Sequence, residues 1–345
     1  MRVTLKQIAE KAGVHISTVD KVLHDRPGVS DAVRAYVQQI IDELGYRPSR
    51  AGRTLQRMGK EYHIVVLLLN VDAKPYIMEG IRKVAEESVF DIRIDAYNSD
   101  FQDAEYQTAL IEQAAEKSCD GIILFPNYDR TVLRAIDKIV ERGIPVITVN
   151  SDIQESRRMC YVGQDGVRGA CIAGRMMGLL TGGSGNVAVI TSAISSENCN
   201  YHVDTRKREF AAFMQKHYPE IRIVRDVESF EKRQYTYDQT RKLLEEIPDL
   251  NGIYITCGCV DVVGKAVQEA GKAGDIRIVS FEDYPEILKL LDQNVVDCTI
   301  AGNLAGQGRK SMQIMLDYLI DGNRPEQEMQ YIDSEILVRE SIVVI

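Results

Sequence analysis

The chain has 345 residues, of which 45% are apolar and 27% charged, and it carries a formal net charge of −9 at pH 7. This composition indicates a globular protein of two or three domains and excludes low-complexity classes. No apolar run reaches the roughly 18 residues of a membrane span, and residues 1–13 lack the apolar stretch of a secretory signal. We therefore expect a cytoplasmic protein with no membrane partner.

The charge is unevenly distributed. Residues 1–60 hold 11 Lys and Arg against 6 Asp and Glu, whereas the remainder holds 31 against 45. A basic segment ahead of an acidic body is typical of a small DNA-binding module joined to a different domain. The alternative is that terminal segments simply vary in charge, and charge alone does not decide between the two.

The seven cysteines are odd in number and have no framework spacing. Cys257 and Cys259 lie two apart, but neither a second cysteine pair nor a histidine cluster accompanies them. We expect free thiols in a reducing compartment, with no metal site and no cofactor.

The first elements in the chain are two short helices joined by a tight turn. Thr4 and Gln7 form a capping-box pattern ahead of a helix over 5–12, and Gly13 ends that helix. A second helix over 16–23 has an apolar inner face and a polar outer face. This helix-turn-helix pattern is typical of proteins that place the second helix in the DNA major groove. A small bundle without a DNA role is the alternative.

A third helix is predicted over 31–44. Ser30 is expected to cap it, Gly45 to end it, and Pro48 to prevent its resumption. Its apolar stripe would complete a core that the first two helices are too short to make alone.

The stretch VTLKQIAEKAGVHISTVDKVLHDRPGVSDAVRAYVQQIIDELGYRPSRAGRTL resembles the N-terminal domain of the lac-repressor (LacI/GalR) family over its full length. The resemblance implies a DNA-binding head at 1–47, a hinge at 48–60 that becomes helical on DNA, and an effector-binding and dimerisation domain at 61–345. It also implies a homodimer on a pseudo-palindromic double-stranded operator. Most members of the family repress transcription, but the sign of regulation stays open.

Matched position by position, the family's motif also implies a set of DNA-binding residues. Leu55 stands where a leucine wedges into the minor groove, and Arg50 and Arg53 stand near phosphates. The full set is Thr4, Ile16, Ser17, Thr18, Lys21, His24, Ser49, Arg50, Arg53 and Leu55. Two positions depart from the family, because His15 and Asp20 stand where serine is common. Asp20 would either accept a hydrogen bond from a cytosine or orient Lys21.

From residue 62 onward, apolar runs of strand length alternate with helical segments, a pattern that indicates parallel strands buried on both faces. The expected strands cover 63–69, 91–97, 120–125, 145–149, 186–190, 221–227, 251–256, 276–281 and 297–301. The expected helices cover 76–87, 103–117, 130–142, 203–217, 234–246 and 261–271. We predict two doubly wound α/β halves in tandem. This body resembles the type I periplasmic sugar-binding fold, so the fold class is an all-α helix-turn-helix head followed by a two-lobed α/β domain.

Ligands of doubly wound folds sit beyond the carboxyl ends of the strands, here between the halves. Polar or aromatic residues near these ends are Asn70, Asp72, Tyr76, Asn150, Asp152, Asp261 and Glu282. The family resemblance adds Arg206. The set suits a sugar or polyol effector, although ordinary turn residues would give a similar pattern. Glu282 replaces the family's usual Asp, Gly302 stands where sugar binders often have Gln, and the chain has no Trp.

Two other function classes remain as rivals. A solute receptor of a transporter would not need the basic head. An enzyme is disfavoured because we find no phosphate loop, nucleophile elbow or metal-spaced histidines. Residues 181–185, TGGSG, follow a helix and precede a strand, which is the reverse of a phosphate loop, so we interpret them as a turn.

Overall fold

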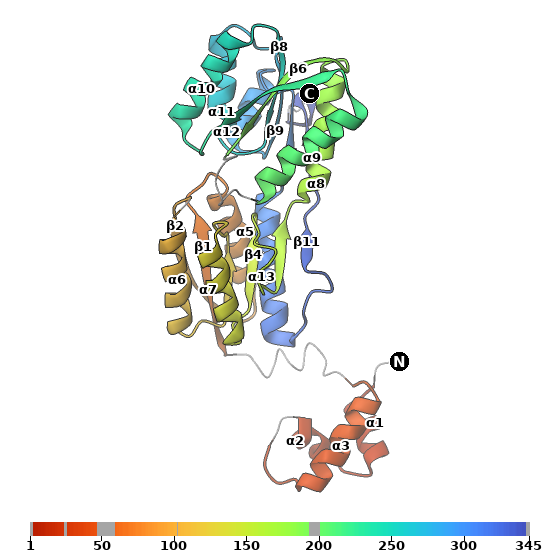
Figure 1. Cartoon of the computed structure of the whole chain (residues 1–345). Coiled ribbons are helices and arrows are strands. Elements are labelled where there is room, and N and C mark those ends of the chain that lie inside the picture. The colour runs from red at the N-terminus through yellow and green to blue at the C-terminus, as the bar shows by residue number, and fades with distance from the viewer. Residues whose placement is uncertain (1–2, 24–25, 47–58, 102, 193–200, 343–345) are drawn as a thin grey trace. The chain divides into compact units, whose positions relative to one another are not determined.

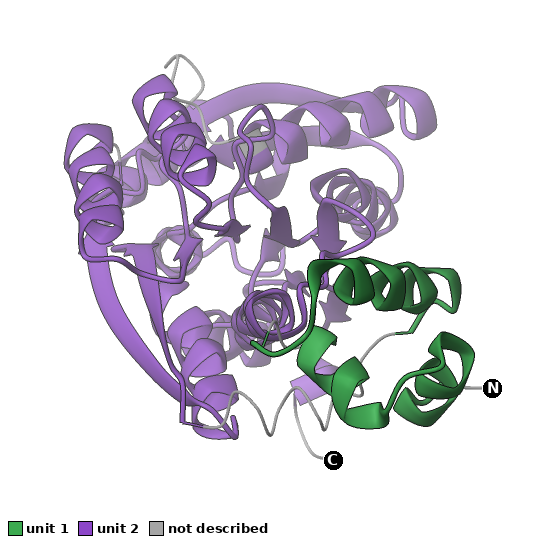
Figure 2. Cartoon of the chain, turned by 90° about the horizontal axis from the view of Figure 1, so that it is seen from below, with its two compact units in different colours: residues 1–58 green, residues 59–345 purple. Residues whose placement is uncertain are grey.

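The computed structural model describes residues 3–23, 26–46, 59–101, 103–192 and 201–342. The chain divides into two compact units, Met1–Met58 and Gly59–Ile345, which Figure 2 colours separately. Most of the predicted hinge, residues 48–60, lies outside the described residues.

The smaller unit contains α1 (Leu5–Ala12), α2 (Ile16–Leu23) and α3 (Asp31–Glu43), so all three predicted helices are confirmed to within one residue. The capping box is present, because Thr4 Oγ1 accepts from Gln7 N and the Gln7 side chain accepts from Thr4 N. Gly13 takes the left-handed conformation that ends α1. The three helices share one core made of Ile8, Ala9, Ala12, Val19, Val22, Val37, Ile40 and Ile41.

The expected side-chain cap at Ser30 is wrong. Ser30 occupies the N-cap position of α3, but its hydroxyl makes no capping hydrogen bond. Its backbone carbonyl instead accepts from Arg34 N at 2.9 Å, so the first turn closes through the main chain.

The larger unit has two lobes, each built on a six-stranded sheet (Figure 1). The sheet of the first lobe is parallel throughout and has the order β11-β5-β4-β3-β1-β2. Its elements are β1 (Glu61–Leu69), α5 (Lys74–Glu86), β2 (Asp91–Ser99), α6 (Ala104–Glu116), β3 (Gly121–Leu124), α7 (Arg130–Glu141), β4 (Val146–Val149), β5 (Cys160–Gly163), α13 (Leu304–Asp321) and β11 (Met329–Tyr331).

The sheet of the second lobe has the order β12-β10-β9-β8-β6-β7 and is parallel except for the β10–β12 pair. Its elements are α8 (Gly166–Leu180), β6 (Gly185–Thr191), α9 (Tyr201–His217), β7 (Ile221–Glu228), α10 (Arg233–Glu246), β8 (Leu250–Ile255), α11 (Val260–Glu269), β9 (Arg277–Phe281), α12 (Pro285–Asp292), β10 (Cys298–Ala301), β12 (Glu335–Leu337) and α14 (Arg339–Ile342).

Each sheet is covered on both faces, which explains its unbroken apolar strands. In the first lobe, α5 and α13 pack on one face and α6 and α7 on the other. In the second lobe, α8 and α9 cover one face, while α10, α11 and α12 cover the other. None of the described helices is long and apolar enough to cross a membrane.

The predicted tandem arrangement of the halves is wrong, because the chain passes between the lobes three times. It leaves the first lobe after β5 at residues 164–165, returns after β10 at 302–303, and leaves again after β11 at 332–334. The three passages lie close together: Ile332 N donates to Gly163 O, and the Gln164 amide lies 3.5 Å from Ile300 O. Together these three crossover segments form the connection between the two lobes.

Candidate functional site

A cavity of about 500 Å³ lies between the two lobes, at the carboxyl ends of their strands. The first lobe contributes Val71, Asp72, Ala73, Pro75, Tyr76, Phe101, Phe125 and Asn150. The second lobe contributes Val203, Arg206, Glu231, Arg233, Cys257, Gly258, Cys259, Val260, Asp261, Phe281, Glu282, Tyr284, Glu286 and Ile287. The size suits one small molecule, and the lining mixes aromatic rings with charged groups.

Six of the eight effector residues expected from the sequence line this cavity: Asp72, Tyr76, Asn150, Arg206, Asp261 and Glu282. Asp72, Asn150 and Glu282 lie in loops, whereas Tyr76, Arg206 and Asp261 lie in α5, α9 and α11, and all six are far apart in the sequence. The parallel sheets bring them together, because every contributing strand ends at the same edge.

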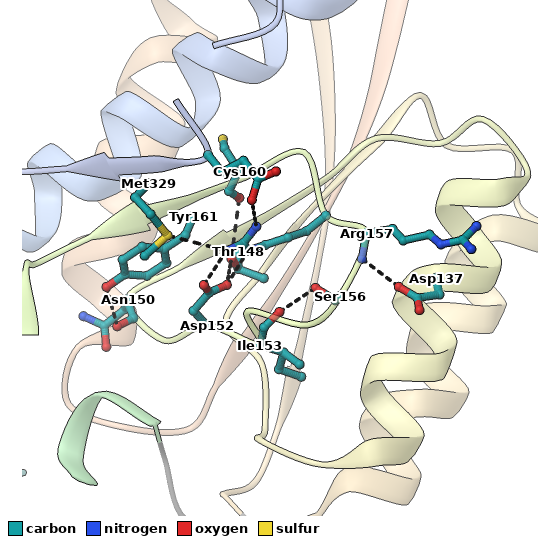
Figure 3. Close-up of polar contacts among 12 residues, drawn as sticks. Asp137, Thr148, Asn150, Asp152, Ile153, Ser156, Arg157, Cys160, Tyr161 and Met329 are labelled. Carbon is teal, nitrogen blue, oxygen red and sulfur yellow. Dashed lines mark hydrogen bonds and ion pairs between the residues drawn. The ribbon is translucent and has the colours of Figure 1, made fainter. Parts of the chain in front are cut away.

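Asn70 and Asp152 do not line the cavity, contrary to expectation. Asn70 is exposed; its amide donates to Asp100 at 2.6 Å and accepts from Lys74 at 2.8 Å. Asp152 is fully buried, and its Oδ2 accepts from the Arg158 guanidinium at 2.6 Å. Thr148 Oγ1 donates to Asp152 Oδ1, also at 2.6 Å. Figure 3 draws this hydrogen bond as a dashed line. Both carboxylate oxygens of Asp152 therefore already accept hydrogen bonds from residues of the first lobe.

Asn150 lies two residues before Asp152 but reaches the cavity. It takes a left-handed conformation with φ of 65°, and its carbonyl accepts from the Tyr161 hydroxyl at 3.3 Å. Its amide donates to Gln307 on α13 at 3.2 Å. Figure 3 shows the Tyr161 ring directed toward Asn150.

Arg206, on α9, is the most heavily engaged cation of the cavity. Its guanidinium donates to Thr256 O at 2.9 Å and to Gln164 Oε1 in the connection between the lobes. It stacks 3.7 Å from the centroid of Phe281, and Nε is buried without a hydrogen-bond partner in the described structure. The guanidinium is therefore held in place both from the second lobe and from the connection between the lobes.

Glu282 faces Arg206 at 3.5 Å and has a positive φ of 74°. Burial raises the pKa of its carboxyl, against the opposing effect of Arg206. Among the described atoms, Oε2 is buried without a hydrogen-bond partner. A Cβ at Gly302 would collide with the side-chain amide of Gln164 and would lie 3.0 Å from Glu282 Oε2, so the missing side chain leaves room for both residues.

Among the described residues, two contacts join lining residues of the two lobes. The Tyr76 and Tyr284 rings stack with centroids 5.5 Å apart. Arg233 binds Asp261 of its own lobe and lies 4.0 Å from Asp72 of the other. Burial raises the pKa of Asp72, and Arg233 opposes that shift.

Several lining residues were not expected from the sequence, chiefly Glu231, Arg233, Phe281 and Tyr284. Glu231 and Arg233 lie in the run SFEKRQ after β7, which resembles an ordinary charged loop. Phe281 and Tyr284 belong to apolar stretches that also fit a core. No local signal separates these residues from their neighbours.

The head presents the outer face of α2 as expected. Ile16 is 42% exposed and Ser17 is exposed, while Thr18 and Lys21 are partly exposed. His15 serves as the cap that a serine commonly provides, because its Nδ1 accepts from Ser17 N at 3.3 Å. Asp20 pairs with Arg26 at 3.2 Å. The predicted DNA contacts His24, Ser49, Arg50, Arg53 and Leu55 lie outside the described residues.

Two family models match the chain. Residues 4–49 match the model described as bacterial regulatory proteins, lacI family, and residues 64–324 match the one described as periplasmic binding protein domain. The second match alone covers more than half of the chain.

Curated proteins similar to the chain are named as transcriptional regulators. HTH-type transcriptional regulator AglR of Rhizobium meliloti is 25% identical over 99% of this chain and 94% of its own. Probable HTH-type transcriptional regulator EndR of Paenibacillus polymyxa is 26% identical over 55% of this chain. The chain spans about half the length of EndR, 54%. The ribose operon repressor of Escherichia coli is 31% identical, over 43% of this chain and 44% of its own.

Solved structures share the fold of the larger unit. GanP, a glucose-galactose binding protein from Geobacillus stearothermophilus, has a TM-score of 0.74 at 23% identity, over 83% of this chain and 100% of its own. A solute-binding protein from Burkholderia graminis in complex with D-arabinose has a TM-score of 0.76 at 18% identity, over 81% of this chain and 96% of its own. At these identities the likeness concerns the fold alone.

Proposed function

The chain belongs to the LacI family of bacterial regulatory proteins and carries a periplasmic binding protein domain, and from this we propose that it is a transcriptional regulator whose DNA affinity is controlled by a small ligand. The head reads a double-stranded operator, and the cavity between the lobes binds a polar effector of the sugar or polyol class. The protein acts as a cytoplasmic repressor and has no catalytic role. The observation that carries the proposal is the combination, in one chain, of a helix-turn-helix head and a two-lobed cavity.

The proposed DNA-binding residues act in two ways. Ile16, Ser17 and Lys21 on the outer face of α2 read base edges, assisted by Thr18, while Thr4 and His24 meet the backbone. In the hinge at 48–60, Ser49, Arg50 and Arg53 hold phosphates and Leu55 wedges into the minor groove. We propose a homodimer on a pseudo-palindromic operator, because two symmetric heads require two symmetric half-sites.

Movement of the two lobes couples effector binding to DNA binding. A ligand that contacts both cavity walls changes the angle between the lobes at the three crossover segments. This change alters the distance between the two hinges (residues 48–60) of the dimer. The Arg206–Gln164 bond supports this proposal, because it joins a cavity residue to one of those segments. Operator and effector then alter each other's affinity by the same factor.

Selection of bound duplexes from a random DNA pool tests the proposal, with wild type, Leu55→Ala and Leu179→Ala run in parallel at fixed salt. Leu179 is an exposed leucine of α8, outside the head, and serves as the matched control. We expect a pseudo-palindromic sequence that wild type and Leu179→Ala enrich equally and that Leu55→Ala binds about tenfold or more weakly. No enrichment over salt-dependent background binding would contradict the operator-reading function and favour a solute receptor.

A further inference from the structure

The cavity holds more carboxylates than cations. Its lining includes five acidic side chains, Asp72, Glu231, Asp261, Glu282 and Glu286, against the two guanidiniums of Arg206 and Arg233. These guanidiniums are already paired, Arg206 with Glu282 and Arg233 with Asp261 and Asp72. Glu231 and Glu286 remain, and Glu286 is exposed whereas Glu231 is partly buried.

The backbone holds Glu231 at the cavity by a strained turn. Phe230 and Glu231, two and three residues after the end of β7, have positive φ angles of 50° and 54°. The left-handed conformation costs about 1–2 kcal/mol for each residue that has a side chain. Phe230 N donates to Ser192 O at 2.7 Å, and Glu231 N donates to Ser229 Oγ at 3.2 Å, so local hydrogen bonds maintain the turn.

The loop after β8, in the same lobe, leaves space for the Glu231 carboxylate and donates to it. Gly258 N donates to Glu231 Oε1 at 3.4 Å, and the Cys257 thiol is a second, weak donor. A side chain at Gly258 would collide with Glu231 Oε2. Within the described part of the chain, no Lys or Arg forms an ion pair with Glu231.

The charges that face Glu231 from the packed elements are Asp72 of the first lobe, which repels it, and Arg206 of α9, which attracts it. Burial dominates and raises the pKa of Glu231 to about 7, with the Gly258 N–H opposing the shift. A carboxylate in this position is poorly compensated by neutral donors, and a cation from outside would stabilise it.

We propose that the effector is a polyhydroxylated molecule carrying a protonated amino group, of the amino-sugar class, and that the ammonium binds Glu231. An ammonium supplies three charge-assisted hydrogen bonds and reduces the excess negative charge of the cavity. The side chains of Arg206 and Glu282, which line the cavity, then bind hydroxyl groups, while Tyr76 and Tyr284 contact the apolar face of the ligand. This inference rests on the proposed function, because it specifies the ligand of the same cavity.

Matched pairs of sugars test the inference, each pair differing only in amine or hydroxyl: glucosamine with glucose, galactosamine with galactose, and mannosamine with mannose. Binding to the full chain is measured by titration calorimetry near neutral pH. We expect at least one amine to bind about tenfold or more tightly than its hydroxyl partner. In Glu231→Gln that preference should fall to within about threefold, because the amide keeps the shape and loses the charge.

Glu245→Gln is the control, since it removes the same charge from an exposed site on α10 of the same lobe. It should keep the amine preference of wild type. If hydroxyl sugars bind as well as their amines in every pair, if no amine binds, or if Glu231→Gln keeps the preference, the inference is overturned. Operator selection with the same preparation reports separately on the proposed function, because DNA binding by the head does not depend on which sugar the cavity accepts.

Discussion

The ring of Tyr76, near the start of α5 in the first lobe, stacks on the ring of Tyr284, the N-cap residue of α12 in the second lobe, with an angle of 22° between their planes. Beside this pair, Arg233 reaches toward Asp72. The two lobes therefore touch through side chains that line the cavity as well as through the chain connections.

Loss of this stacking should favour an open arrangement of the lobes. An aromatic pair contributes about 0.5–1.5 kcal/mol beyond the area it buries, which is enough to change the ratio of open to closed molecules by about twofold to tenfold. Tyr76→Ala should accordingly increase the radius of gyration measured by small-angle X-ray scattering. Tyr106→Ala, which removes an exposed tyrosine of α6 in the same lobe, should not, and equal scattering from both variants would contradict the expectation.

Two adjacent arginines should differ sharply in their effect on stability. The side chains of Arg158 and Asp152 are 2% and 0% exposed, whereas those of Arg157 and Glu141 are 62% and 59% exposed. Arg158→Ala leaves a buried carboxylate without its cation and should lower the free energy of unfolding by about 3–5 kcal/mol. Arg157→Ala should lower it by about 1 kcal/mol or less. Urea unfolding measures both, and similar losses would show that burial of the Arg158 pair has no special effect.

Glu231 should make stability depend on pH. Its pKa of about 7 in the folded protein exceeds its ordinary value of 4.5, so the folded state binds more protons than the unfolded state between these values. The free energy of unfolding therefore falls as pH rises through this window. Other acidic residues with raised pKa values act in the same direction, so the informative quantity is the difference between wild type and Glu231→Gln. Urea unfolding at several values between about pH 5 and pH 8 should show that difference declining, and a constant difference would contradict the raised pKa.

The contact between α5 and α13 should not tolerate a methyl group at Gly80. A Cβ there would lie 2.8 Å from Ala305 C and 2.9 Å from Arg309 N, and backbone atoms cannot move aside without shifting the helix. Gly80→Ala should lower the free energy of unfolding by about 1–3 kcal/mol or more. At Gly166 the nearest atoms would be 3.5 Å away, so Gly166→Ala should be nearly neutral. A chemical-denaturation comparison in which the two variants unfold at the same midpoint would contradict this.

Local signals predicted the head more completely than the body. Thr4, Gln7 and Gly13 fix the ends of α1 through hydrogen bonds within a few residues, so the sequence alone was enough. In the body, α13 was not predicted, because Gly306 and Gly308 disfavour a helix. The helix forms because Gly308 lets its backbone approach Ile77 of α5, a contact between residues distant in the sequence. β5 was also not predicted: it is as short as β3 and β4, but its sequence CYVG lacks their run of Ile, Leu and Val.

The site was predicted in outline, since strand ends are visible in the sequence whereas side-chain partners are not. Asn150 and Asp152 follow the same strand and look equally suited to a ligand. The hydrogen bonds from Arg158, six residues later, hold Asp152 away from the cavity, whereas Asn150 lines it. Glu231 reaches the cavity only because Gly258, on another loop, leaves space for it.

The three passages of the chain between the lobes also set an order for synthesis. The first sheet lacks β11 until residues 329–331 have been made, and by then nearly all of the second lobe already exists. At roughly 5–20 residues per second, on the order of 10 s or more separates β5 from the strand that pairs with it. During that interval the outer edge of β5 and the groove that receives α13 stay uncovered on the nascent chain. Neither lobe can therefore be released as a continuous fragment by a single cut, and truncation near the C-terminus would damage the lobe that is made first.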